Sequence, residues 1–146
     1  MTLEFIGFVG TQEASEIIPP SGPVVDPAYA RSVALAHEAG GFDRVLIAHN
    51  SASPDGVVIA GQVLAQTERL SVLLAHRPGF VAPTLAARTL ATLDQFSRGR
   101  IAVHIISGGD DADQSGSGRN HLSVRVQNCV FASCRPCRYG PWRMDG

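Results

Sequence analysis

Residues 70–106, LSVLLAHRPGFVAPTLAARTLATLDQFSRGRIAVHII, decide the fold. The runs Leu70–Ala75 and Ile101–Ile106 are short, apolar and bounded by polar or turn residues, as buried strands are. Between them a loop with proline and glycine leads into a helix-length stretch that begins at Pro83 and turns at Ser97-Arg98-Gly99. A strand, a helix and a strand in this order predict one unit of a parallel α/β sheet.

The same pattern recurs toward the N-terminus. Strands are predicted at Leu3–Val9 and Arg44–Ala48, and the later strand starts are about thirty residues apart, the size of one βα unit. One helix is predicted from Asp26-Pro27 to Gly40-Gly41, and another from Ser53-Pro54-Asp55 to Thr67-Glu68-Arg69. Two architectures remain open, a doubly wound sheet and a (β/α)8 barrel. The absence of a G-x-G-x-x-G motif after the first strand weakens the doubly wound alternative.

Helical periodicity also predicts which side chains each helix buries. In the second helix the predicted apolar face consists of Val57, Val58, Gly61, Leu64 and Ala65. In the third helix it consists of Ala86, Leu90, Leu93 and Phe96.

Composition places the chain among cytoplasmic globular proteins. With 45% hydrophobic and 17% charged residues, no apolar run long enough for a bilayer and no secretory signal at Met1, we expect neither a membrane nor a nucleic-acid partner. The 146 residues suffice for one domain, but a closed (β/α)8 barrel needs roughly 250. The chain is therefore about half as long as a closed barrel requires.

The composition changes after Gln114, which predicts a boundary between residues 1–114 and 115–146. The first part holds seven Arg and twelve Asp or Glu, a charge of -5, and the second holds five Arg and one Asp, a charge of +4. All three cysteines lie in the second part, where Cys134-Arg135-Pro136-Cys137 has the spacing of zinc or redox sites. A single such pair does not define a metal site, and the acidic cluster Asp110, Asp111 and Asp113 does not match a calcium loop, so no metal is predicted.

Polar residues follow three successive strands, where parallel α/β folds bind their ligands. His49, Asn50, Ser51 and Ser53 follow the second strand, His76 and Arg77 the third, and Ser107, Gly108 and Gly109 the fourth. The histidines are either general acids or cofactor ligands, or exposed loop residues. Arg77 either binds an anionic oxygen or forms a surface salt bridge. Ser107-Gly108-Gly109 offers backbone N–H groups for close approach of a flat ring or an anion.

Four segments together resemble the N-terminal half of the bacterial luciferase-like flavin-dependent monooxygenases, and within that family the alkanesulfonate-oxidising branch. They are RVLIAHNSASPD (44–55), AHRPG (75–79), PTLAARTLATLD (83–94) and SRGRIAVHIISGG (97–109), and the resemblance covers roughly residues 3–114. It implies that this chain forms the first half of a (β/α)8 barrel, about four βα units, and that the family's barrel binds reduced FMN at the carboxyl end of its strands. A separate NAD(P)H-dependent flavin reductase supplies the FMNH2, and O2 then forms a peroxyflavin that oxidises a small organic substrate.

The resemblance also assigns roles to individual residues. It implies that Ala75, His76, Ser107, Gly108 and Gly109 line the flavin. It places His49 and Ser53 in the substrate-side loop, with Ser53 where sulfonate-oxidising relatives often carry cysteine near the flavin. Arg77, as a candidate ligand of an anionic oxygen, is the third predicted catalytic residue.

Beyond Gln114 the sequence departs from the family pattern. The Arg, Cys, Gly and Pro mixture, in a chain without lysine, leads to the hypothesis of a frameshifted or truncated gene product. Sequencing the locus across the codon for Gln114 tests this, and an intact frame ending at Gly146 contradicts it. Two alternatives remain: a non-catalytic half-barrel that persists as a homo-oligomer through its open strand edges, and a deazaflavin-dependent oxidoreductase of the same superfamily.

Overall fold

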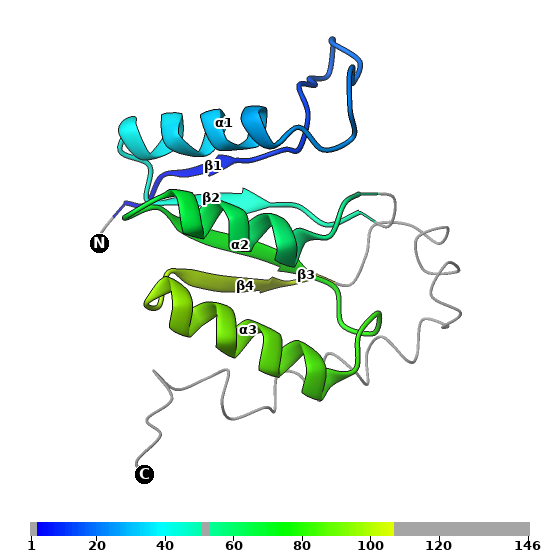
Figure 1. The fold of residues 1–146 in the computed structure, drawn as a ribbon, viewed down its shortest axis with the longest axis vertical. Coiled ribbons are helices and arrows are strands. Elements are labelled where there is room, and N and C mark those ends of the chain that lie inside the picture. The colour runs from blue at the N-terminus through cyan, green and yellow to red at the C-terminus, as the bar shows by residue number, and fades with distance from the viewer. Residues whose placement is uncertain (1–2, 51–52, 107–146) are drawn as a thin grey trace. The chain divides into compact units, whose positions relative to one another are not determined.

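Strands and helices alternate throughout the part of the chain that the computed structural model describes, residues 3–50 and 53–106 (Figure 1). The elements in chain order are β1 (Ile6–Phe8), α1 (Pro27–Ala39), β2 (Arg44–Ile47), α2 (Gly56–Gln66), β3 (Ser71–His76), α3 (Pro83–Ser97) and β4 (Ile101–Ile105). Every strand and helix predicted between residues 3 and 106 is present, although β1 is shorter than the predicted Leu3–Val9.

The strands form one sheet in the order β1-β2-β3-β4. β1 pairs with β2 and β2 with β3 in parallel, with Gly7 opposite Val45 and Val45 opposite Val72. Between β3 and β4 the hydrogen bonds also advance in the same direction along both strands, from Val72 N to Arg100 O (2.8 Å) and from Ile106 N to His76 O (3.0 Å). A doubly wound sheet reverses its strand order at a switch point, whereas a (β/α)8 barrel adds strands in sequence. The observed order is that of the barrel, and it resolves the alternative left open by the sequence.

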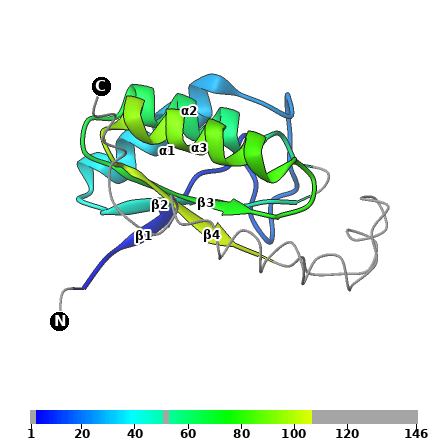
Figure 2. The same ribbon diagram turned by 90° about the horizontal axis from the view of Figure 1, so that it is seen from below.

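The described residues divide into two compact units. The first, with described residues 3–50, 53–75 and 100–104, contains most of the sheet with α1 and α2, which cover the same face of it (Figure 2). The second contains the described residues 76–99 and 105–106, and therefore α3 and the loop that precedes it.

The core of the first unit lies between the sheet and its two helices. Alternate strand residues point to this face, and Val45, Ile47, Val72 and Leu74 are at most 2% exposed. Each such burial contributes about 1.5–3 kcal/mol relative to an exposed side chain. At Gly56 an added Cβ would lie 3.0 Å from Leu74 Cδ1, so α2 starts close to the sheet because its first residue lacks a side chain.

Aspartates cap the first two helices, and the cap at Asp26 is the one that the sequence predicts. Asp26 Oδ1 accepts hydrogen bonds from the backbone N–H groups of Ala28 (2.9 Å) and Tyr29 (3.0 Å) ahead of α1. Asp55 Oδ1 accepts them from Val57 (2.9 Å) and Val58 (3.0 Å) ahead of α2. Each cap satisfies amide groups that have no partner within the helix, which is worth about 1 kcal/mol.

The predicted helix faces need three corrections, of which one is that Ala65 on α2 is exposed. Phe96 is 85% exposed whereas Ser97 is 3% exposed, and Val58 is 65% exposed whereas Ala60 and Val63 are buried. Successive helical residues turn by about 100°, so Ser97 returns to within about 20° of Ala86 while Phe96 lies about 80° away. The prediction placed Phe96 on the buried face because it is hydrophobic, but the geometry of the helix places Ser97 there instead.

Arg100 joins the end of α2 to the start of β3 within the first unit. Its Nη2 donates to Leu64 O (2.7 Å), and its Nη1 donates to Leu70 O (2.9 Å) and Thr67 Oγ1 (3.2 Å). The guanidinium therefore satisfies the carbonyl of Leu64, which the end of α2 leaves without a helical partner, and the carbonyl of Leu70 just before β3.

We expect Arg100→Met to lower the free energy of unfolding by about 2–3 kcal/mol, because the variant keeps most of the side-chain volume but loses these charge-assisted hydrogen bonds. Urea unfolding measures the change. Arg88→Met, at an exposed position of α3, is the matched control and should stay within about 0.5 kcal/mol of the parent. Equal losses in the two variants would contradict a specific role for Arg100.

Candidate functional site at the carboxyl ends of the strands

In the first unit the segment after β2 carries three of the predicted site residues. His49 is half-buried, and Asn50 and Ser53 are exposed. The backbone N–H of Ser53 donates to Asn50 O (3.0 Å), and this turn leads to Asp55, the N-cap of α2. Since β1 and β2 run parallel, this segment and the one that follows Val9 leave the sheet at the same edge.

In the second unit the segment after β3 holds a buried cation. Arg77 is 2% exposed, and its guanidinium carbon lies 5.0 Å from the centroid of the Phe80 ring. A surface salt bridge, one of the two interpretations of Arg77, is inconsistent with this burial. A desolvated cation–π pair is worth about 2 kcal/mol, so the ring helps to hold the charge away from water. The sequence did not identify Phe80, although an aromatic residue three positions after an arginine is the signal that could have found it.

Ala75 and His76 lie at the very end of β3. Ala75 is 7% exposed, and the carbonyl of His76 accepts the hydrogen bond from Ile106 N. His104 lies on β4, where it is exposed. The other predicted positions, Ser51, Ser107, Gly108 and Gly109, lie outside the described residues, as do the acidic cluster and all three cysteines.

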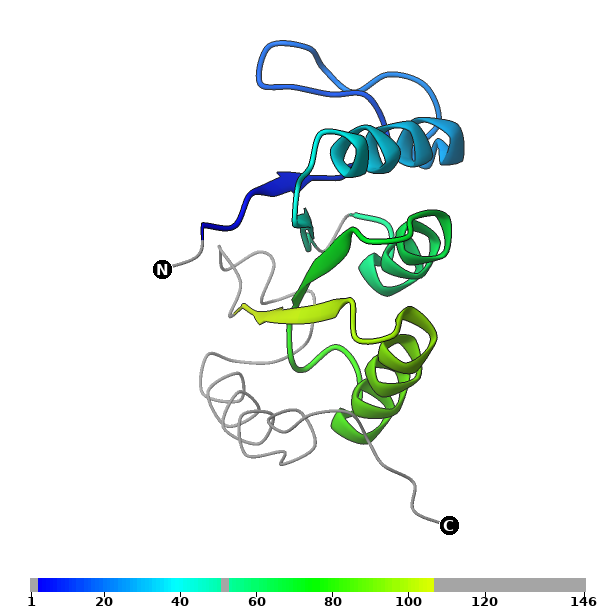
Figure 3. The same ribbon diagram turned by 90° about the vertical axis from the view of Figure 1, so that its left-hand side faces the viewer.

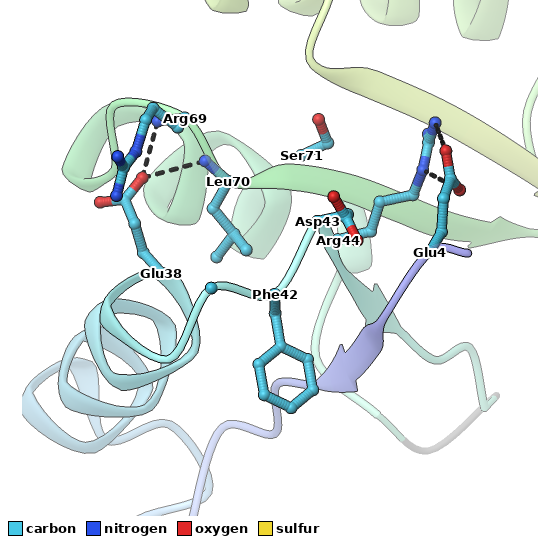
Figure 4. Close-up of a pocket in the computed structure, with 9 residues that line it drawn as sticks. Glu4, Glu38, Phe42, Asp43, Arg44, Arg69, Leu70 and Ser71 are labelled. Carbon is cyan, nitrogen blue, oxygen red and sulfur yellow. Dashed lines mark hydrogen bonds and ion pairs between the residues drawn. The ribbon is translucent and has the colours of Figure 1, made fainter. Parts of the chain in front are cut away.

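A cavity of about 420 Å³ lies at the opposite edge of the sheet, at the amino ends of β2 and β3 (Figure 4). Its lining consists of Glu4, Glu38, Gly41, Phe42, Asp43, Arg44, Arg69, Leu70 and Ser71, and none of these was predicted as a site residue. Arg44 Nε donates to Glu4 Oε2 at 3.1 Å, an ion pair between partly exposed side chains. The cavity therefore has an ion pair of its own and lies at the edge of the sheet away from the predicted site.

Glu38, at the end of α1, fixes the loop between α2 and β3 beside this cavity. Its Oε1 accepts hydrogen bonds from the backbone N–H groups of Glu68 (2.9 Å), Arg69 (2.6 Å) and Leu70 (2.9 Å). These bonds, with that from Arg69 the strongest, lower the pKa of Glu38 below its ordinary value of 4.5 against the opposing effect of burial. The role of Glu38 is structural, and nothing in its local sequence indicates a partner thirty residues away.

Within residues 3–50 and 53–106, no three His, Cys, Asp or Glu side chains are grouped as a metal site requires. None of the described helices has the length and apolarity needed to span a membrane.

Comparison with known proteins identifies the chain's relatives. The family model described as luciferase-like monooxygenase matches residues 3–125. Among solved structures, EDTA monooxygenase from Chelativorans sp. BNC1 superposes with a TM-score of 0.74 at 14% identity over 88% of this chain. The oxygenating constituent of 3,6-diketocamphane monooxygenase from Pseudomonas putida, in complex with FMN, gives 0.71 at 17% identity over 89% of this chain.

A third similar structure uses a different cofactor. The coenzyme F420 dependent tetrahydromethanopterin reductase from Methanopyrus kandleri superposes with a TM-score of 0.64 at 16% identity over 83% of this chain. At these identities the structures establish the fold alone. The chain spans 35%, 38% and 31% of the lengths of the three proteins, respectively.

Proposed function

Because the chain belongs to the luciferase-like monooxygenase family, we propose that it takes part in a reduced-FMN-dependent oxygenation of a small organic substrate. The family match makes it an oxidoreductase by descent, and one similar structure was solved with FMN bound. The observation that carries the proposal is the buried Arg77 directly after β3, beside Ala75 and His76 at the carboxyl end of a barrel strand.

The donor chemistry of the strand-end residues fits a reduced flavin. Reduced FMN presents ring carbonyls, an acidic ring nitrogen and a phosphate, all of which accept hydrogen bonds or attract a cation. His76 and Arg77 supply N–H groups of this kind after β3, and Ala75 is small enough for a flat ring to approach. We assign these residues to cofactor binding, with the backbone of Ser107, Gly108 and Gly109 completing the set.

When bound, FMN supplies the electrons that activate O2. The protein's own contribution is to exclude water, to orient the substrate and to stabilise negative charge on the reacting oxygen. Arg77 is suited to the last task because burial strengthens the field of its charge, and His49 can donate or hold a proton. Ser53 offers an exposed hydroxyl on the substrate side.

The resemblance to the alkanesulfonate branch suggests an alkanesulfonate-like substrate, which this reaction would convert to an aldehyde and sulfite. The proposal also includes an NAD(P)H-dependent flavin reductase as partner, a cytoplasmic setting and a homo-oligomer.

A deazaflavin-dependent hydride transfer is the second candidate, and the similarity to the F420 dependent reductase is the observation that favours it. Oxygen uptake separates the two, because hydride transfer to or from a deazaflavin consumes no O2.

We expect Arg77→Gln to lower the affinity for reduced FMN by about tenfold or more, since it removes the one buried cation among these strand-end residues. Anaerobic fluorescence titration measures the affinity, and circular dichroism verifies that the variant is folded. Arg88→Gln, on the exposed surface of α3, should bind FMN like the parent chain. Unchanged affinity in a folded Arg77→Gln chain would remove Arg77 from the cofactor site.

A further inference from the structure

The loop that joins β1 to α1, residues 10–26, exposes apolar side chains at the edge of the sheet where the strands end. Ile17 is 90% exposed, and Ile18, Val24 and Val25 are between 48% and 63% exposed. The loop lies beyond the carboxyl end of β1 and beside the start of α1 (Figure 1 and Figure 3). The segment with His49 leaves the sheet at this same edge, in the same unit. Exposed apolar surface next to a candidate site indicates a place where a ligand binds.

Phe8, the last residue of β1, extends this surface onto the sheet. Gly7 faces α1, since an added Cβ there would meet the His37 ring, and successive strand side chains alternate, so Phe8 faces the opposite side of the sheet. Phe8 is 55% exposed, and its Cε1 would lie 3.5 Å from an ideal Cβ at Gly10, where the loop begins. Together with the exposed residues of the loop it forms what we call the β1 loop surface: Phe8, Ile17, Ile18, Val24 and Val25.

Hydrogen bonds within the loop give it a defined shape. Its two ends are joined by the backbone N–H of Asp26, which donates to Thr11 O (2.7 Å). Ser15 Oγ accepts from Ile18 N (3.0 Å), and Ser15 N donates to Ile18 O (2.9 Å). Three prolines restrict the backbone further, at Pro19, Pro20 and Pro23. The loop therefore holds its apolar side chains in place, which reduces the entropy lost when a ligand covers them.

The loop carries negative charge and no positive charge. Residues 10–26 contain Glu13, Glu16 and Asp26 and no Arg or Lys, and the first basic residue of the chain is Arg31, in the second turn of α1. The carboxylate of Asp26 accepts hydrogen bonds from the first N–H groups of α1, whereas Glu13 and Glu16 are exposed. These two carboxylates would repel a nearby anion, to an extent that added salt reduces. A hydrocarbon meets no such repulsion and gains from leaving water.

We propose that the β1 loop surface binds the uncharged hydrocarbon part of the organic substrate, and that Glu13 and Glu16 keep an anionic group away from it. An alkanesulfonate would then lie with its alkyl chain, and not its sulfonate, on the loop. The position of the loop at the carboxyl end of the strands, where (β/α)8 barrels bind their ligands, favours a substrate as the occupant. The identity of the occupant rests on the proposed function, but the apolar, acidic character of the surface does not.

Two dyes that differ only in charge test the proposal on the full chain without FMN. N-phenylnaphthylamine is neutral, and anilinonaphthalene sulfonate has the same rings with a sulfonate added. Fluorescence titration should show the neutral dye binding about tenfold or more tightly than the sulfonated dye. Glu13→Gln combined with Glu16→Gln should strengthen binding of the sulfonated dye by about threefold and leave the neutral dye unchanged. Equal affinities in the parent chain, or no gain in this variant, would overturn the role of the two glutamates.

A second pair of variants locates the bound neutral dye. Ile17→Ser combined with Val24→Ser should weaken its binding by about tenfold, because the apolar contact is lost at side chains too exposed to matter for folding. Val58→Ser removes a side chain that is 65% exposed on α2, and it should bind the dye like the parent chain. Decanol should displace the dye from the parent chain. Equal affinities in both variants, or no displacement, would place the dye elsewhere and contradict the proposal.

The same titration at rising concentrations of the chain distinguishes a substrate surface from a contact between copies. Dye affinity should stay constant; a decline would mean that a second copy covers the loop, and would overturn the proposal. Because neither flavin nor oxygen is present, the outcome is independent of FMN binding. A chain that binds FMN but shows no dye site at the loop disproves this inference alone, and a chain with the dye site but no FMN binding disproves the proposed function alone.

Discussion

Replacing Gly7 by alanine is expected to destabilise the fold by about 3 kcal/mol or more. An ideal Cβ at Gly7 would lie 2.1 Å from His37 Cδ2 and 2.3 Å from His37 Nε2, far inside van der Waals contact. The imidazole cannot simply turn away, because its Nδ1 lies 2.8 Å from Val33 O and its ring packs edge-on against Phe42 at 4.7 Å between centroids. α1 must therefore separate from β1, which opens the core of the first unit.

Urea unfolding of Gly7→Ala measures this effect, and Gly10→Ala is the matched control. At Gly10 the nearest atom to an added Cβ is 3.5 Å away, an ordinary contact, so we expect a change within about 1 kcal/mol. Combining Gly7→Ala with His37→Ala should recover part of the loss, because the colliding ring is gone. Equal effects at the two glycines would show that the close approach of α1 to β1 is not a constraint.

The second large effect is expected at Glu38, and it should depend on pH. Glu38→Gln removes the charge on an oxygen that accepts three backbone N–H groups, and it should cost about 2 kcal/mol at pH 7. The pKa of Glu38 is lowered in the folded chain, so the carboxylate's contribution is present above its ordinary pKa of 4.5. This stabilising contribution is lost as the pH falls through the lowered pKa that Glu38 has in the folded chain.

Urea unfolding of the parent chain and Glu38→Gln at pH 7, 5 and 3 measures this difference. The difference in free energy of unfolding between the two proteins should be largest at pH 7 and should shrink toward pH 3. Glu68→Gln, at an exposed position in the same loop, is the control and should change the free energy of unfolding little at any pH. A difference that stays constant with pH would mean that the packing of the Glu38 side chain, and not its charge, stabilises the loop.

Local signals explain what the sequence could predict of this fold. Asp26-Pro27 and Asp55 set the helix starts through caps that involve only neighbouring residues, and the apolar runs set the strands. Strand order was not predictable in this way, because it depends on pairing between residues such as Val45 and Val72. The sequence did not predict two sets of hydrogen bonds for the same reason: those of Glu38 with residues 68–70 and those of Arg100 with the end of α2. Each set joins segments about thirty residues apart.

The candidate site was predictable only as a set of strand-end positions. Topology places polar residues such as His49 and His76 at the ends of parallel strands whatever their neighbours are. Burial is different: the local sequence around Arg77, a proline-glycine turn, is typical of an exposed loop, but in the fold Arg77 is 2% exposed and its guanidinium carbon lies 5.0 Å from the centroid of the Phe80 ring. That burial is what distinguishes a surface ion pair from a candidate cofactor ligand.

The most direct test of the central claim is an anaerobic titration of the purified chain with reduced FMN, in which flavin fluorescence and sedimentation are followed together. We predict saturable binding at micromolar FMN by a discrete oligomer, which would show that the first four βα units of this family build a working flavin site. No saturable binding, or flavin associated only with aggregates, would contradict the claim and would mean that the cofactor site of this family requires more than this chain provides.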